Sequence, residues 1–194
     1  MFQKCFKKKE KEQKAFTLIE LLVVIAIIAI LSSIVYSKIS SSIVSTKVSR
    51  SVMEVDRIQE AFKLFEADTG AWPARCRIQN NCSVTIDPFL NNLGVNGWKG
   101  PYITKGIYNT VHGWGGHLGL ERYDINSDGV LEVFIIFDDD PPGGTPKDIG
   151  SISDANLLLI DQKIDDGDLS TGRFRSIVPG VSTGAGSGVY FLTP

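Results

Sequence analysis

The chain has 194 residues, 43% of them hydrophobic, and a net charge of −2 at pH 7. This length and composition suit one globular domain with an additional segment and exclude a chain that is disordered throughout. The weak negative charge argues against a nucleic-acid-binding surface.

The first fifteen residues are strongly basic. They hold six lysines and two glutamates, an excess of four positive charges. By the positive-inside rule this end is expected to stay in the cytoplasm. Removal of residues 1–15 leaves 20 − 6 = 14 basic and 22 − 2 = 20 acidic residues, a net charge of −6.

An almost purely apolar segment follows and carries a single carboxylate, Glu20, near its start. A lone acid within a membrane-spanning helix costs roughly 2.5 to 3.5 kcal/mol on insertion scales, so Glu20 is predicted to be functional. The small residue Ala15 precedes the apolar segment instead of following it, unlike the cleavage site of an ordinary signal peptide. Processing at this point would therefore leave the apolar helix on the protein.

The segment Phe16-Thr-Leu-Ile-Glu20 resembles the class III leader of type IV pilins and type II secretion pseudopilins. The resemblance implies cleavage by prepilin peptidase between Ala15 and Phe16, although the family usually has Gly at the position of Ala15. It also implies methylation of the new terminus at Phe16. Glu20 would pair with the terminal ammonium of a neighbouring subunit, which relieves the desolvation cost of both charges.

The chain has no proline or glycine from Phe16 to about Ala67, so one helix on the order of 50 residues is predicted, ending at Asp68-Thr69-Gly70. Residues 16–37 are expected to form a transmembrane and assembly helix, and residues 38–67 its amphipathic continuation. The later part carries an apolar stripe predicted to pack on a globular head: Val48, Val52, Val55, Ile58, Phe62 and Phe65.

The head, residues 68–194, is predicted to be a small antiparallel sheet laid on the helix, with strands at 118–123 and 130–137 and a short final strand at 189–192. The fold class is thus α+β and pilin-like. The segment Gly100-Pro101-Tyr102 is similar to one that follows the helix in major pseudopilins. Cys76 and Cys82 lie in the part of the chain expected outside the cytoplasm, where a disulfide closing their short loop is predicted over free thiols or half a metal site.

Twelve acidic residues lie between Asp124 and Asp168 against two lysines, which favours a bound cation. Residues 124–132 match the first nine positions of an EF-hand-type calcium loop and predict a calcium site. The twelfth position of such a loop carries a bidentate acid, whereas this chain has Ile135 there. Major pseudopilins are similar in having a calcium-stabilised loop late in the head. The candidate ligands are Asp124, Asn126, Asp128, Val130 and Glu132.

Three other groups of residues are weaker candidates. The acidic segment 161–168 is interpreted as a solvated turn in preference to a metal site, and His112 and His117 as loop residues in preference to ligands. No nucleophile elbow, Walker loop, dinucleotide fingerprint or zinc motif occurs, so no enzyme is predicted. A hydrolase would rest on the carboxylates of residues 138–140 alone.

The expected function is that of a structural subunit of a type II secretion pseudopilus or type IV pilus-like filament. Its expected partners are prepilin peptidase, copies of itself and other pilin-like subunits, the assembly platform and the inner membrane, which it would cross once with its head in the periplasm. The alternative is a minor or tip pilin that binds a surface or a cargo through Trp72, Trp98 or Trp114.

Overall fold

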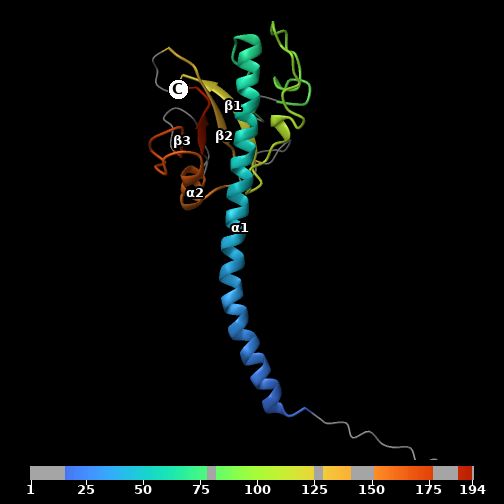
Figure 1. The fold of residues 1–194 in the computed structure, drawn as a ribbon, viewed down its shortest axis with the longest axis vertical. Coiled ribbons are helices and arrows are strands. Elements are labelled where there is room, and N and C mark those ends of the chain that lie inside the picture. Colours follow the sequence, from blue (N-terminus) through green and yellow to red (C-terminus); the bar gives the residue numbers. More distant parts are fainter. Residues whose placement is uncertain (1–15, 78–81, 125–128, 141–150, 177–187, 194) are drawn as a thin grey trace, which may run out of the picture. The chain divides into compact units, whose positions relative to one another are not determined.

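The computed structural model describes residues 16–77, 82–124, 129–140, 151–176 and 188–193. Its elements are α1 (Leu18–Thr69), the 3₁₀ helix η2 (Ile107–Asn109), α2 (Asp154–Ile164) and four strands. The chain divides into two compact units, residues 1–42 and residues 43–194 (Figure 1). Helix α1 begins in the first unit and ends in the second.

Helix α1 is 52 residues long and ends where the sequence predicts. Gly70 follows the last helical residue with φ 63°. Glycine adopts this left-handed conformation without steric cost. The N–H of Gly70 donates a hydrogen bond of 2.8 Å to the carbonyl oxygen of Glu66. This bond satisfies one of the carbonyls left open at the helix end.

The amphipathic stripe of α1 forms one side of the core of the second unit, as predicted. Val55, Ile58 and Phe65 are at most 1% exposed. Each such side chain contributes roughly 1.5 to 3 kcal/mol by leaving water. Tyr102 meets the ring of Phe65 edge-on at a centroid distance of 5.7 Å. The loop that contains the Gly-Pro-Tyr segment is thereby anchored to the helix.

A four-stranded antiparallel sheet forms the other side of the core, in the order β1-β2-β4-β3. The strands are β1 (Leu118–Tyr123), β2 (Glu132–Phe137), β3 (Phe174–Arg175) and β4 (Val189–Phe191). Strands β1 and β2 pair from Leu118 with Phe137 to Tyr123 with Glu132. The predicted strands at 118–123, 130–137 and 189–192 are therefore present, and β2 begins two residues later than predicted.

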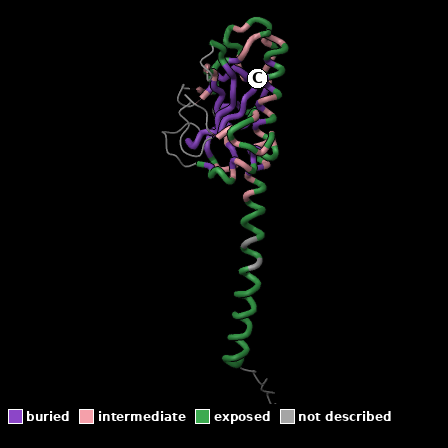
Figure 2. Tube along the Cα trace, turned by 90° about the vertical axis from the view of Figure 1, so that its left-hand side faces the viewer, coloured by how far each residue is buried: buried purple, intermediate pink, exposed green. Residues whose placement is uncertain are grey.

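The two faces of the sheet contribute to different apolar clusters, because successive side chains of a strand point in opposite directions. One cluster joins Leu118, Ile135 and Phe137 to the stripe of α1. The second is formed by Phe134, Ile136, Val189 and Phe191. Buried residues gather between the sheet and the helix, whereas the early turns of α1 are exposed along their length (Figure 2).

Three elements were not predicted from the sequence: the 3₁₀ helix η2, helix α2 and strand β3. Helix α2 covers Asp154–Ile164 and lies beside β3 (Figure 1), so Asp161 belongs to a helix and not to a turn. The helix is only 11 residues long, and its buried apolar residues, Leu157 and Ile160, are too few to show a helical period clearly. Strand β3 has two residues, fewer than any strand pattern needs.

Candidate functional site

The first unit presents an apolar helical surface. Phe16 is 84% exposed and the 18-residue apolar window of α1 has none of its residues buried. By length and composition this helix can cross a membrane, a property that signal sequences share. The motif that flanks the segment, and not the helix itself, distinguishes a signal sequence from a membrane helix that stays on the protein. Ala15, the predicted residue before the cleavage site, lies outside the described residues.

Glu20 closes a capping box at the start of α1. Its Oε2 accepts hydrogen bonds from the backbone N–H of Thr17 at 2.8 Å and from the Thr17 hydroxyl at 2.7 Å. The Glu20 N–H donates in return to Thr17 Oγ1 at 3.3 Å. Thr17 is not among the residues predicted to be functional, although Ser or Thr followed three residues later by Glu is the signature of this cap. In the single chain, Glu20 is thus held by its own helix terminus.

The predicted disulfide joins Cys76 and Cys82. Cys76 is fully buried and forms a β-bridge with Leu120, exchanging backbone hydrogen bonds of 2.9 and 2.8 Å. The bridge therefore fastens the segment after α1 to strand β1.

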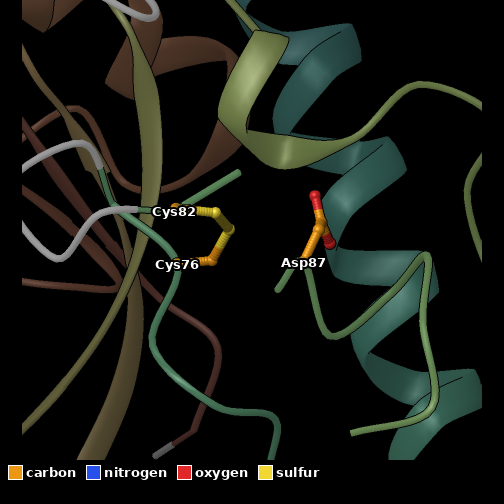
Figure 3. Close-up of side chains that lie close together, drawn as sticks. All are labelled: Cys76, Cys82 and Asp87. Carbon is orange, nitrogen blue, oxygen red and sulfur yellow. A yellow bond between two sulfur atoms is a disulfide. The ribbon is translucent and has the colours of Figure 1, made fainter. Parts of the chain in front are cut away.

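Asp87 lies near the disulfide, between it and helix α1 (Figure 3). Its carboxylate is fully buried and accepts the backbone N–H groups of Phe89 at 3.0 Å and Ile107 at 2.6 Å. Since both sulfurs are consumed by the disulfide, these three residues act as a structural joint and do not offer the thiolates that a metal requires.

The predicted calcium loop is described only in part, because Asn126 and Asp128 lie outside the described residues. Asp124 Oδ2 accepts the N–H of Gly129 at 2.9 Å, and Gly129 has φ 85°. Glu132 is 5% exposed and lies in β2 opposite Tyr123. The calcium site stays a prediction.

The two histidines are buried core residues, at most 1% exposed. Burial lowers the pKa of each to about 4, so both are neutral at pH 7. His112 Nε2 is 3.0 Å from the carbonyl oxygen of Asp138, whereas neither ring nitrogen of His117 has a hydrogen bond of ordinary geometry in the described part of the chain. The described clusters of three or more potential metal ligands include neither histidine.

The carboxylates of residues 138–140 are buried as well, at 2%, 8% and 4% exposure. Arg77 Nε donates to Asp138 Oδ2 at 2.7 Å, and Asp138 Oδ1 accepts the N–H of Asp140 at 3.2 Å. Arg77 also lies 3.8 Å from Glu121. An arginine-paired, structural carboxylate fits these contacts better than a pair of exposed catalytic acids.

All three tryptophans are half-buried and pack against the core. Trp72 Nε1 donates to Glu66 at 3.1 Å, Trp98 Nε1 donates to a main-chain carbonyl, and the ammonium of Lys47 lies 5.7 Å from the ring centroid of Trp114. An amphipathic anchor explains each ring, so the tryptophans give the adhesive-tip alternative no specific support.

A long N-terminal helix with a small antiparallel sheet defines an α+β protein consistent with the pilin-like fold. The family model described as the prokaryotic N-terminal methylation motif matches residues 11–36. The chain therefore carries a type IV pilin-like class III leader, and the motif indicates a type IV pilin-like protein that prepilin peptidase processes. No curated protein and no solved structure matches the chain.

Proposed function

We propose that the chain is a structural subunit of a type II secretion pseudopilus or a type IV pilus-like filament. The observation that carries this proposal is the methylation motif at residues 11–36 running into a helix whose apolar window has no buried residue. Such a surface has to be covered by lipid before assembly and by neighbouring helices afterwards. The protein crosses the inner membrane once, with its head in the periplasm, and assembles with further pilin-like subunits on an inner-membrane platform.

Glu20 provides the register of assembly under this proposal. In the single chain its carboxylate is occupied by Thr17, at 2.8 and 2.7 Å. Cleavage between Ala15 and Phe16 creates a terminal ammonium one residue before Thr17 and four before Glu20. A neighbouring subunit's ammonium then competes for the carboxylate, and only the correct axial offset between helices brings the two charges together.

Mass spectrometry of the amino terminus tests the processing step. Protein from cells with prepilin peptidase should begin at a methylated Phe16, and protein from cells without the enzyme should retain residues 1–15. An intact leader, or a different cut, in cells that contain the enzyme would refute the proposed processing and with it the filament function.

Calcium binding by the loop 124–132 is a separate proposal. It is supported by Asp124, which closes the loop onto the N–H of Gly129 at 2.9 Å, and by the alternating oxygen side chains of the sequence. A chelator should lower the melting temperature of a soluble fragment beginning near Ser45, and the difference should be smaller in Asp128→Ala than in wild type. A melting curve unchanged by the chelator would reject the site.

A further inference from the structure

Three carboxylates converge where helix α2 ends. Asp161 lies in the last turn of α2, and Asp165 and Asp166 follow directly after the helix. One oxygen from each of the three lies within 4.8 Å of the others. Calcium binds oxygens at about 2.4 Å, so two of its ligands can be at most about 4.8 Å apart. The spacing of these oxygens therefore allows all three to bind one ion.

Asp161 is the member of this cluster that needs a partner. The residue is 0% exposed, and neither carboxylate oxygen has a hydrogen bond of ordinary geometry in the described part of the chain. A buried carboxylate without a counter-ion is costly, because its contacts with the protein stabilise the charge less than water does. A fully buried acid close to two further carboxylates lowers the stability of the folded chain unless another group compensates the charge.

The other two carboxylates are already held in place by the loop. Asp165 Oδ2 accepts the N–H groups of Phe174, at 3.0 Å, and Arg173. Asp166 accepts the N–H of Asp168 at 2.9 Å and the hydroxyl of Thr171 at 2.9 Å. A carboxylate has about four lone-pair sites, so both keep the capacity to bind a cation. The loop thus orients its acids before any ion arrives.

The basic side chains near the cluster are engaged elsewhere. Lys163 Nζ donates to Ser49 at 3.0 Å, and Arg173 donates to the carbonyl of Phe191 and stacks 4.9 Å from the centroid of Tyr190. Within the described chain, no ion pair neutralises Asp161, Asp165 or Asp166. Among the described residues, no basic side chain therefore neutralises the negative charge of the cluster.

We propose that Asp161, Asp165 and Asp166 bind a divalent cation, with calcium as the best fit to an all-oxygen site on a loop. The ion ties the end of α2 to the loop that leads into β3, and so fastens the edge of the sheet. This site is separate from the predicted loop 124–132. It does not depend on the filament function.

The surroundings of Asp161 disfavour its negative charge. Burial, followed by the charges of Asp166, Asp165 and Asp168, raises its pKa to about 6, and the nearby N–H of Gly167 offsets this only weakly. The surroundings of Asp161 thus penalise its ionised form. A divalent ion removes the penalty by replacing the repulsion with attraction.

Equilibrium dialysis of the full-length protein in detergent, with calcium alone as the probe, tests the site. Wild type should bind calcium at this site, and Asp161→Asn, which keeps the shape but removes the charge, should lose one bound ion per chain. The exposed Asp166→Asn is a second variant and should weaken the affinity at least tenfold. The matched control is Asp154→Asn, an exposed acid in the first turn of the same helix, which should bind as wild type does.

Near-UV circular dichroism establishes that each variant is folded. The variant Asp124→Asn should still bind the ion that Asp161→Asn loses. This comparison distinguishes the site at Asp161 from the loop 124–132. Wild type that binds no calcium at millimolar concentration, or a folded Asp161→Asn that binds as many ions as wild type, would overturn the proposal. Neither result would bear on amino-terminal processing.

Discussion

Acid should destabilise the head because two histidines are buried in neutral form. Burial lowers the pKa of His112 and His117 from 6.5 to about 4, against the smaller, opposite effect of Asp138. Their unfolded forms take up a proton near pH 6.5. Between these values the unfolded chain binds more protons than the folded one, so stability is lost as the pH falls from 6.5 towards 4.

The pKa difference sets the magnitude. For a group that titrates near 6.5 unfolded and near 4 folded, the free energy of unfolding at pH 5 is about 2 kcal/mol below its value at pH 8. Two such groups together lower it by up to about 4 kcal/mol, a large share of the stability of a small domain. Most carboxylates titrate at lower pH, but the raised pKa of Asp161, about 6, makes the folded chain take up a proton over the same range and offsets about 1 kcal/mol of the loss.

Urea unfolding of a soluble fragment of residues 43–194, followed by tryptophan fluorescence at pH 8, 7, 6 and 5, measures this loss. His117→Leu is the informative variant, because neither ring nitrogen of His117 has a hydrogen bond of ordinary geometry among the described residues. It should remove about 2 kcal/mol of the loss between pH 8 and pH 5. A wild-type change below about 1 kcal/mol between pH 8 and pH 5, or an unaltered slope in His117→Leu, would refute the reasoning.

Three further predictions follow from the helix and the disulfide. Glu20→Ala should leave cleavage intact but impair filament assembly in a pelleting assay, whereas Thr17→Ala removes a capping hydroxyl, keeps the carboxylate and should still assemble; normal assembly of Glu20→Ala would sink the pairing. Phe65→Ala should cost about 3 to 5 kcal/mol in urea unfolding, because a large buried ring is removed. Its ring is 1% exposed, whereas Met53 is 70% exposed. Truncation of Met53 should therefore change stability by less than about 0.5 kcal/mol, and equal losses in the two variants would contradict the packing. Replacing Cys76 and Cys82 together by serine should cost about 2 kcal/mol for so short a loop, and reductant should then have no further effect on the melting temperature.

Several elements of the fold are specified by residues that lie close together in the chain. The end of α1 at Thr69 is specified by Gly70, and its buried side by the spacing of Val55, Ile58 and Phe65, because helix termination and amphipathicity depend on residues close in the chain. The strand β1 has the bounds predicted from the sequence, and β2 is predicted to within two residues because its apolar, β-branched residues stand between turn signals. The leader and its motif are likewise a property of consecutive residues.

The tertiary structure alone decided which polar residues lose their water. His117, Asp87 and Asp161 look like ordinary loop or surface residues in the sequence, yet all three are fully buried. Their burial depends on contacts with residues remote in the chain, such as the N–H of Ile107 on Asp87. Helix α2 belongs to the same class, since an 11-residue helix is stable only through packing. Sequence therefore determined the leader, the long helix and the main strands, whereas long-range packing determined the buried charges from which the cation site is inferred.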